Sequence, residues 1–238
     1  MNTTAIVLTI ILLILIYVLI RYFTSGASTL TKTASLSSSN PAITSLSNAG
    51  SQNYAYGVWL YINSWNSGSN HVIFERPKNI KLYLDPNKPV LYCDIYTSKT
   101  NASGAQIVQT ITITDNFPIQ SWTYISVVVD GGLYVDSYIN GKLVNSTQLS
   151  NVALQPNSSA STVPVSIGSA SGVNNFDASI AGFQNWSYVI GPQDVWSAYM
   201  SGNSGGLAGS LSRMFNSYSV DVTLKNNTTK SSSTMQIL

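Results

Sequence analysis

The stretch WTYISVVVDGGLYVDSYINGKLV, residues Trp122–Val144, alternates apolar and polar residues on both sides of two turn signals. Val, Ile and Tyr dominate it, and their side chains fit the pleated surface of a sheet. Asp-Gly-Gly at 130–132 and Asn-Gly at 140–141 provide residues that adopt the backbone angles of tight hairpin turns. The stretch therefore predicts three antiparallel strands joined by two hairpins.

Comparable runs occupy most of the chain around this stretch. They are YAYGVWLYI (54–62), HVIFE (71–75), IKLYL (80–84), VLYCDIY (90–96), IVQTITIT (107–114), VPVSIGS (163–169) and ASIAGFQNWSYVI (178–190). The one segment typical of a helix is GPQDVWSAYMSG (191–202), where Pro192 suits a first helical turn. Many short strands without helices between them predict an all-β fold, a jelly-roll sandwich of two antiparallel sheets over residues 41–203.

The first 23 residues have a different composition. AIVLTIILLILIYVLI, residues 5–20, contains no charged or amide side chain. A helix over residues 5–23 would be about 30 Å long, which matches the hydrocarbon core of a bilayer. No basic residue precedes the run, which favours a transmembrane anchor over residues 1–23 rather than a cleaved signal peptide. The residues expected at the membrane–water interface are Tyr17, Arg21, Tyr22 and Phe23.

Two further segments complete the predicted organisation. Residues 24–40 are rich in Ser and Thr and are interpreted as a flexible tether, and residues 204–238 form a Gly/Ser-rich C-terminal extension. Arg21 and Lys32 follow the apolar run, so the positive-inside rule places the β domain on the cytosolic side of a single-pass membrane protein. The lipid bilayer is thus an expected partner.

Composition excludes several classes of function. Charged residues make up 8% of the chain and the net charge is +2, which argues against a nucleic-acid partner. A single cysteine, Cys93, allows no intrachain disulfide. Glu75 is the only glutamate, whereas retaining glycosidases need two carboxyl groups about 5–5.5 Å apart. We therefore expect the protein not to be an enzyme.

Three of these segments together resemble the concanavalin A-like lectin/glucanase superfamily, and most closely its laminin-G-like modules. They are residues 121–144, VPVSIGS, and FDASIAGFQNWSYVIGPQDVWSAYMSG (176–202). The positions that carry the resemblance are Trp122, Asp130, Gly131, Tyr138, Asn140, Gly141, Lys142, Ile167, Gly168, Asp177, Ile180 and Phe183. The resemblance implies a sandwich with a short helix after its closing strand. It implies no single activity, because one fold hosts many functions.

A candidate glycan site lies in the loop NSWNSGSNH, residues 63–71. Sugar sites combine an aromatic platform with groups that form hydrogen bonds. Trp65 could supply the platform, and Asn66, Asn70 and His71 the polar groups. The alternative is that Trp65 caps the core of the sandwich.

A candidate calcium site lies in GVNNFD, where Asn174, Asn175 and Asp177 could direct oxygen atoms at one ion. Asp and Asn in loops also form turns without any metal. No other cofactor is expected.

Two functions are compatible with these observations. The first is a membrane-anchored structural module that docks onto other proteins. Its architecture resembles that of virion proteins of large DNA viruses, which implies a minor capsid protein linked to an inner membrane, with capsid proteins as partners. The alternative is a carbohydrate-binding lectin or adhesin, displayed on a cell or virion surface, with glycans as partners.

Overall fold

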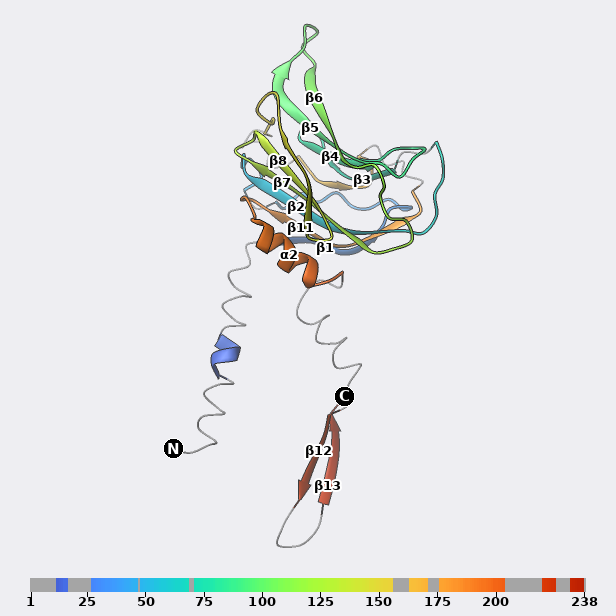
Figure 1. Ribbon diagram of the computed structural model, residues 1–238, viewed down its shortest axis with the longest axis vertical. Coiled ribbons are helices and arrows are strands. Elements are labelled where there is room, and N and C mark those ends of the chain that lie inside the picture. The colour runs from blue at the N-terminus through green and yellow to red at the C-terminus, as the bar shows by residue number, and fades with distance from the viewer. Residues whose placement is uncertain are drawn as a thin grey trace.

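The computed structural model describes residues 12–16, 27–46, 48–68, 71–155, 163–170, 176–203, 220–225 and 232–237. Two antiparallel sheets pack face to face (Figure 1). The six-stranded sheet has the order β1 (Ser28–Ser35), β11 (Ala178–Trp186), β2 (Tyr54–Ile62), β7 (Thr123–Asp130), β8 (Tyr134–Ile139), β9 (Lys142–Gln148). The five-stranded sheet has the order β10 (Ser166–Ile167), β3 (His71–Arg76), β4 (Ile80–Leu84), β5 (Leu91–Thr100), β6 (Gln106–Thr114). The predicted all-β sandwich of two antiparallel sheets is confirmed.

The three strands predicted from residues 122–144 are β7, β8 and β9, paired in sequence. Asn140 and Gly141 both have positive φ, at 50° and 77°, as the β8–β9 turn requires. The Asn140 side chain also accepts a hydrogen bond from the Tyr124 backbone N–H at 2.9 Å. The turn residues therefore set the pairing of all three strands.

The main core fills the space between the sheets. Leu60 and Val127 from the six-stranded sheet meet Leu82 and Ile95 from the five-stranded sheet, and all are at most 1% exposed. Cys93 lies in this core with no exposed surface, and burial raises the pKa of its thiol. Burial of apolar side chains on both inner faces is what holds a sandwich together.

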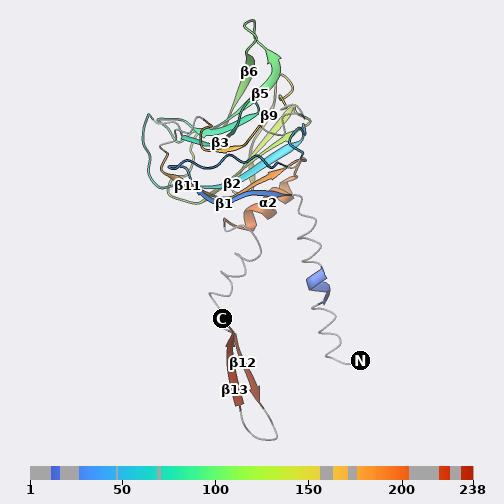
Figure 2. The same ribbon diagram turned by 180° about the vertical axis from the view of Figure 1, so that it is seen from behind.

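A helix covers the outer face of the six-stranded sheet. α2 spans Pro192–Met200, as the sequence predicts, and begins with Pro192 in its first turn. Val195 is fully buried, and Tyr199 stacks on Trp59 of β2 with ring centroids 5.4 Å apart. Figure 2 shows α2 against the layer that contains β1, β2 and β11, on the opposite side from β3. The sandwich consequently has one helix-covered layer and one layer without a helix in the described part of the chain.

The prediction of a flexible tether over residues 24–40 is wrong for residues 28–36. Residues Ser28–Ser35 form β1, an edge strand that pairs with β11, and Leu36 has no exposed surface. STLTKTAS contains three β-branched threonines, which are compatible with an edge strand even though the segment has no aromatic residue. Strand pairing and the buried Leu36 outweigh the low hydrophobicity of the segment.

At the N-terminus, residues 12–16 form a short helix. Within the residues described, no helix has the length and apolar character needed to cross a membrane. The expected interface residues Tyr17, Arg21, Tyr22 and Phe23 lie outside the described residues. Within the C-terminal extension, β12 (Val220–Lys225) and β13 (Ser232–Ile237) pair as an antiparallel hairpin.

Candidate functional site

The outer face of the five-stranded sheet carries an array of polar and aromatic side chains. The strands β4 and β5 alternate between buried and half-buried residues, so every second side chain points outward. The outward side chains of β4, β5 and β6 are Lys81, Tyr83, Tyr92, Asp94, Tyr96, Val108, Thr110 and Thr112. We call this set, together with Glu75 on β3, the open face.

Strand register places the charged residues of the open face in one row. Glu75 pairs with Lys81, Lys81 with Asp94, and Asp94 with Thr110. Neighbouring strands lie about 4.8 Å apart, so Glu75 and Asp94 are separated by roughly 10 Å with Lys81 between them. The sheet thus brings together two carboxylates that are 19 residues apart in sequence.

Asp94 is fixed by its neighbours in this row. Its Oδ1 accepts hydrogen bonds from the Thr110 hydroxyl at 2.6 Å and from the Tyr83 hydroxyl at 3.3 Å. The Tyr83 ring lies 5.6 Å from the Tyr92 ring between centroids, and Lys81 Nζ is 5.1 Å from the centroid of Tyr83. These contacts hold the aromatic and charged groups in one connected arrangement.

Two tyrosine hydroxyls of the open face, those of Tyr83 and Tyr96, stay protonated over a wide pH range. Burial raises the pKa of Tyr83 to about 12, with a further contribution from the Asp94 charge. Burial also raises the pKa of Tyr96, and the carboxylates of Asp94 and Glu75 add to the effect. Both hydroxyls can therefore donate hydrogen bonds at neutral pH.

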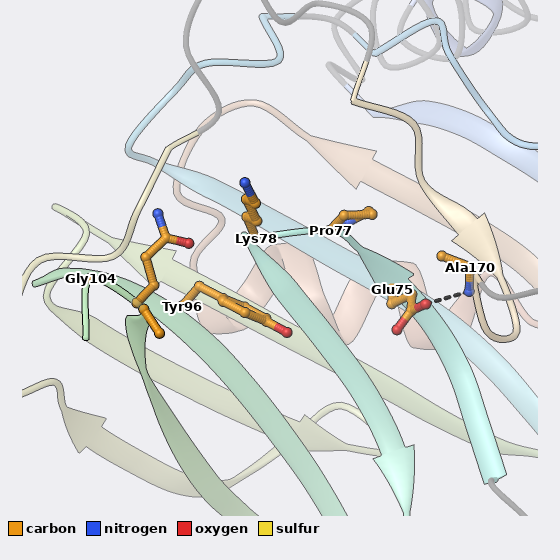
Figure 3. Close-up of a pocket in the computed structure, with 8 residues that line it drawn as sticks. Glu75, Pro77, Lys78, Tyr96, Gly104 and Ala170 are labelled. Carbon is orange, nitrogen blue, oxygen red and sulfur yellow. Dashed lines mark hydrogen bonds between the residues drawn. The ribbon is translucent and has the colours of Figure 1, made fainter. Parts of the chain in front are cut away.

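A cavity of about 620 Å³ opens at the end of this row beside Glu75. Its lining residues are Glu75, Pro77, Lys78, Tyr96, Gly104, Ala105, Gln106 and Ala170. Glu75 Oε1 accepts a hydrogen bond from the Ala170 backbone N–H, and Figure 3 shows the Tyr96 hydroxyl directed from β5 toward the side of the cavity where Glu75 lies. The volume is within the range of sites for small ligands.

The loop of residues 63–71, predicted from the sequence as a glycan site, does not present all of its predicted ligand residues to solvent. His71 is 1% exposed, and its ring lies between Trp65 and Phe176, with centroids 4.4 and 4.6 Å away. Its Nδ1 and Nε2 lie 3.1 Å from the backbone oxygens of Asp85 and Asn66, respectively. The imidazole is therefore enclosed, which corrects its expected role as a surface ligand for sugar.

Trp65 is half-buried and packs against the main core, as in the core-capping alternative. Asn66 is exposed, and Asn70 lies outside the described residues. The loop is thus anchored to the sandwich through Trp65 and His71, because both rings pack inward at the end of β3.

Of the predicted calcium residues, Asp177 is described and Asn174 and Asn175 are not. Asp177 accepts hydrogen bonds from the Ser64 hydroxyl at 2.6 Å and from the Asn63 side-chain amide at 3.0 Å. These two bonds, with Ser64 the stronger influence, lower the pKa of Asp177. Both carboxylate oxygens thus bind the turn that follows β2, which is the turn-forming role.

The open face was not predicted from the sequence. Its signal was the alternation of IKLYL and VLYCDIY, in which Lys, Tyr and Asp occupy every second position. Alternation identifies the outward residues of each strand but leaves open which of them are neighbours.

Comparison with known proteins assigns the family. The family model of the concanavalin A-like lectin/glucanases superfamily, in its laminin-G form, matches residues 33–196. The chain belongs to this superfamily. No curated protein matches the sequence.

Among solved structures, three botulinum neurotoxin domains share the fold. The serotype D ligand binding domain, in complex with N-acetylneuraminic acid, is 18% identical with a TM-score of 0.51, over 73% of this chain and 43% of that one. The receptor binding domain of neurotoxin D is 16% identical with a TM-score of 0.52, over 73% and 45%. The serotype D binding domain is 16% identical with a TM-score of 0.51, over 74% and 44%. The matched region is less than half of each neurotoxin chain, and the similarity is one of fold.

Proposed function

We propose that this protein is a non-enzymatic carbohydrate-binding module that holds a saccharide on the open face of its five-stranded sheet. The observation that carries the proposal is the row Glu75–Lys81–Asp94–Thr110 beside the tyrosines of β4 and β5. Sugars present both apolar C–H surfaces and many hydroxyl groups. A site for them therefore combines flat aromatic rings with hydrogen-bonding groups held in place.

The tyrosines provide the apolar part of the site. Tyr83 and Tyr92 are half-buried neighbours, so the part of each ring that remains exposed is held rigid by the other. A tyrosine loses little conformational entropy on binding and offers a large amphipathic surface. Tyr96, four residues after Tyr92 on β5, extends the same aromatic strip toward the cavity.

The charged groups favour a neutral saccharide. Glu75 and Asp94 can accept hydrogen bonds from sugar hydroxyls, whereas Lys78 and Lys81 can donate them. Lys81 belongs to the open face and Lys78 lines the adjoining cavity, so the two acids and two bases balance and an acidic sugar gains no long-range attraction. The sialic acid complex of a neurotoxin domain with this fold supports the general class of ligand, and the charge balance suggests a different sugar.

The same geometry argues for binding without hydrolysis. The roughly 10 Å between the two carboxylate positions exceeds the ~5–5.5 Å of retaining glycosidases. In an inverting enzyme a water molecule lies between the two carboxylates, but here Lys81 occupies the strand between them. Each carboxylate already accepts a hydrogen bond, Asp94 from the Thr110 hydroxyl and Glu75 from the Ala170 backbone N–H, so both are held in place by the sheet.

The predicted membrane anchor is part of this proposal. An anchored module with a free sugar-binding face would act as a lectin or adhesin next to a membrane. Docking onto capsid proteins is the competing hypothesis, and no described contact favours it over saccharide binding.

Binding of the full-length protein in detergent to a panel of neutral and sialylated oligosaccharides tests the proposal. Tyr92→Ala and Asp94→Ala should each weaken the affinity for neutral sugars about tenfold or more. Tyr134→Ala is the matched control, because this tyrosine is 50% exposed but lies on β8 of the other sheet. Affinity unchanged in Tyr92→Ala and Asp94→Ala, or no binding to any sugar, would contradict the proposal.

A further inference from the structure

Helix α2 carries two large apolar side chains that are partly exposed. Trp196 is 45% exposed and Met200 is 62% exposed. They are four positions apart, so they lie on one side of the helix. Val195 and Tyr199 pack on the sheet. The Trp196 ring contacts Tyr199, with centroids 5.4 Å apart, and lies next to Gly141. These contacts cover one part of the Trp196 ring, and the remaining part is exposed together with Met200.

The short helix near the N-terminus exposes apolar side chains in every direction. Leu12, Leu13, Ile14, Leu15 and Ile16 are each between 42% and 60% exposed. Successive residues are about 100° apart around a helix, so five of them cover its whole circumference. A helix that is apolar on all sides is suited to a hydrocarbon environment.

The chain enters the sandwich next to α2. Ala27 packs against the cluster that contains Val195 and Trp59, and β1 begins at Ser28. If the anchor ends at Phe23, four residues, 24–27, remain between it and the cluster. Fully extended, four residues span about 14 Å. The entry point beside α2 would therefore remain within this distance of the bilayer.

The charges around Trp196 are balanced. Asp194 is the only charged residue of α2, and its carboxylate accepts a hydrogen bond from the Gly191 backbone N–H at 3.2 Å. Gly141, which adjoins the Trp196 ring, is followed by the exposed Lys142. Tryptophan prefers the boundary between headgroups and acyl chains. One acid and one base give no preference for an anionic surface, so a zwitterionic lipid is the appropriate partner.

From these observations we propose that Trp196 and Met200 rest on the surface of the bilayer in which the N-terminal segment is inserted. The contact rests on the anchor that belongs to the proposed function. It gives α2 a second role besides covering the sheet. It also orients the module, because the open face belongs to the opposite layer of the sandwich (Figure 1) and is directed away from the membrane.

The test uses the full-length protein in phosphatidylcholine discs whose acyl chains are brominated close to the headgroup. Bromine quenches tryptophan fluorescence only at short range. We expect brominated discs to reduce the emission relative to plain discs, and Trp196→Phe to abolish most of this reduction. Met200→Asp should also restore emission, because a carboxylate at this position lifts α2 from the lipid.

Val108→Asp is the matched control, since Val108 is 38% exposed on β6 of the other sheet and should leave the quenching unchanged. Quenching that persists in Trp196→Phe would overturn the contact, as would quenching equally sensitive to Val108→Asp. Co-elution with the discs reports on the anchor separately. If the protein co-elutes with the discs but its fluorescence is not quenched, the contact of α2 with lipid is refuted and the anchor stands. If the protein does not co-elute, both the anchor and the contact are refuted. Saccharide binding, measured on the same discs, is independent of either result.

Discussion

The two outer faces of the sandwich carry similar aromatic residues, which are buried on one face and partly exposed on the other. On the six-stranded sheet, Trp59, Tyr124 and Tyr138 are at most 8% exposed, because α2 and the segment before it cover them. On the five-stranded sheet, the tyrosines of β4 and β5 are half-buried beside charged groups. The same kind of side chain thus belongs to a second core on one layer and to a candidate ligand site on the other.

The difference comes from what covers each sheet. Because both faces of β7 are covered, seven of its eight residues are buried. None of the helices that the structure describes lies over β4, and alternate positions there remain available for Lys and Tyr. Three expectations test this comparison, beginning with the largest effect.

The largest expected difference is between the effects of Trp59→Ala and Tyr92→Ala on the free energy of unfolding. Trp59 stacks on Tyr199 and contacts Tyr124, both with centroids 5.4 Å away, so its removal leaves a large cavity under α2. We expect Trp59→Ala to lower the free energy of unfolding by about 3–5 kcal/mol. Tyr92→Ala should lower it by roughly 1 kcal/mol or less, because solvent already reaches the ring. Urea denaturation followed by circular dichroism measures the free energy of unfolding of both variants. Equal losses in the two variants would refute the distinction between a covered and an open outer face.

Alkaline pH should distinguish buried from half-exposed tyrosines. Burial raises the pKa of Tyr56 from 10.0 to about 12, partly offset by Arg76. Below pH 10 the group is protonated in both states and contributes no pH dependence. Between pH 10 and about 12 the unfolded chain loses this proton first, so the stability of the folded state falls by about 2–3 kcal/mol.

Denaturation curves at several pH values measure this slope. Tyr56→Phe should make the slope shallower, whereas Tyr83→Phe should change it less, because solvent screens the partly exposed Tyr83. A steeper dependence on Tyr83 would mean that the open face is less accessible than described.

The smallest contrast is between two turn glycines. Gly141 has φ at 77° and a Cβ there would lie 2.7 Å from Cε3 of Trp196, whereas Gly131 has φ at 57° with no atom within 4 Å. Alanine strains the backbone at both positions. Gly141→Ala should lower the free energy of unfolding by about 1 kcal/mol more than Gly131→Ala does, because the Trp196 ring must move aside. Thermal unfolding of the two variants gives the difference, and equal midpoints would show that α2 packs loosely over the turn.

Much of the fold could be predicted from local sequence. The hairpins of residues 122–144 follow from alternation and from Asn140 and Gly141, and Pro192 indicates the start of α2. The edge strand β1 was missed, since Ser28–Ser35 has few of the β-branched aliphatic and aromatic residues that indicate strands. Its position is stabilised by pairing with β11, which is 143 residues or more away in the sequence.

The candidate site was less predictable than the fold. The loop around Trp65 and His71 has the composition of a sugar site. The His71 ring, however, packs between Trp65 and Phe176 and is not accessible at the surface. Composition cannot distinguish a polar ring on a loop from one that folds inward. The exposure of these groups depends on Phe176, which comes more than 100 residues later.

By itself, the sequence determined the class of fold, the superfamily, the positions of the turns and which residues on each strand face outward, because these depend on neighbours within a few residues. Only the tertiary structure decided that Glu75, Lys81 and Asp94 form one row and that α2 covers the other sheet. The physical reason is register. A strand's side chains alternate whatever its partner, but which side chains become neighbours depends on pairing and packing between segments that are distant in the chain.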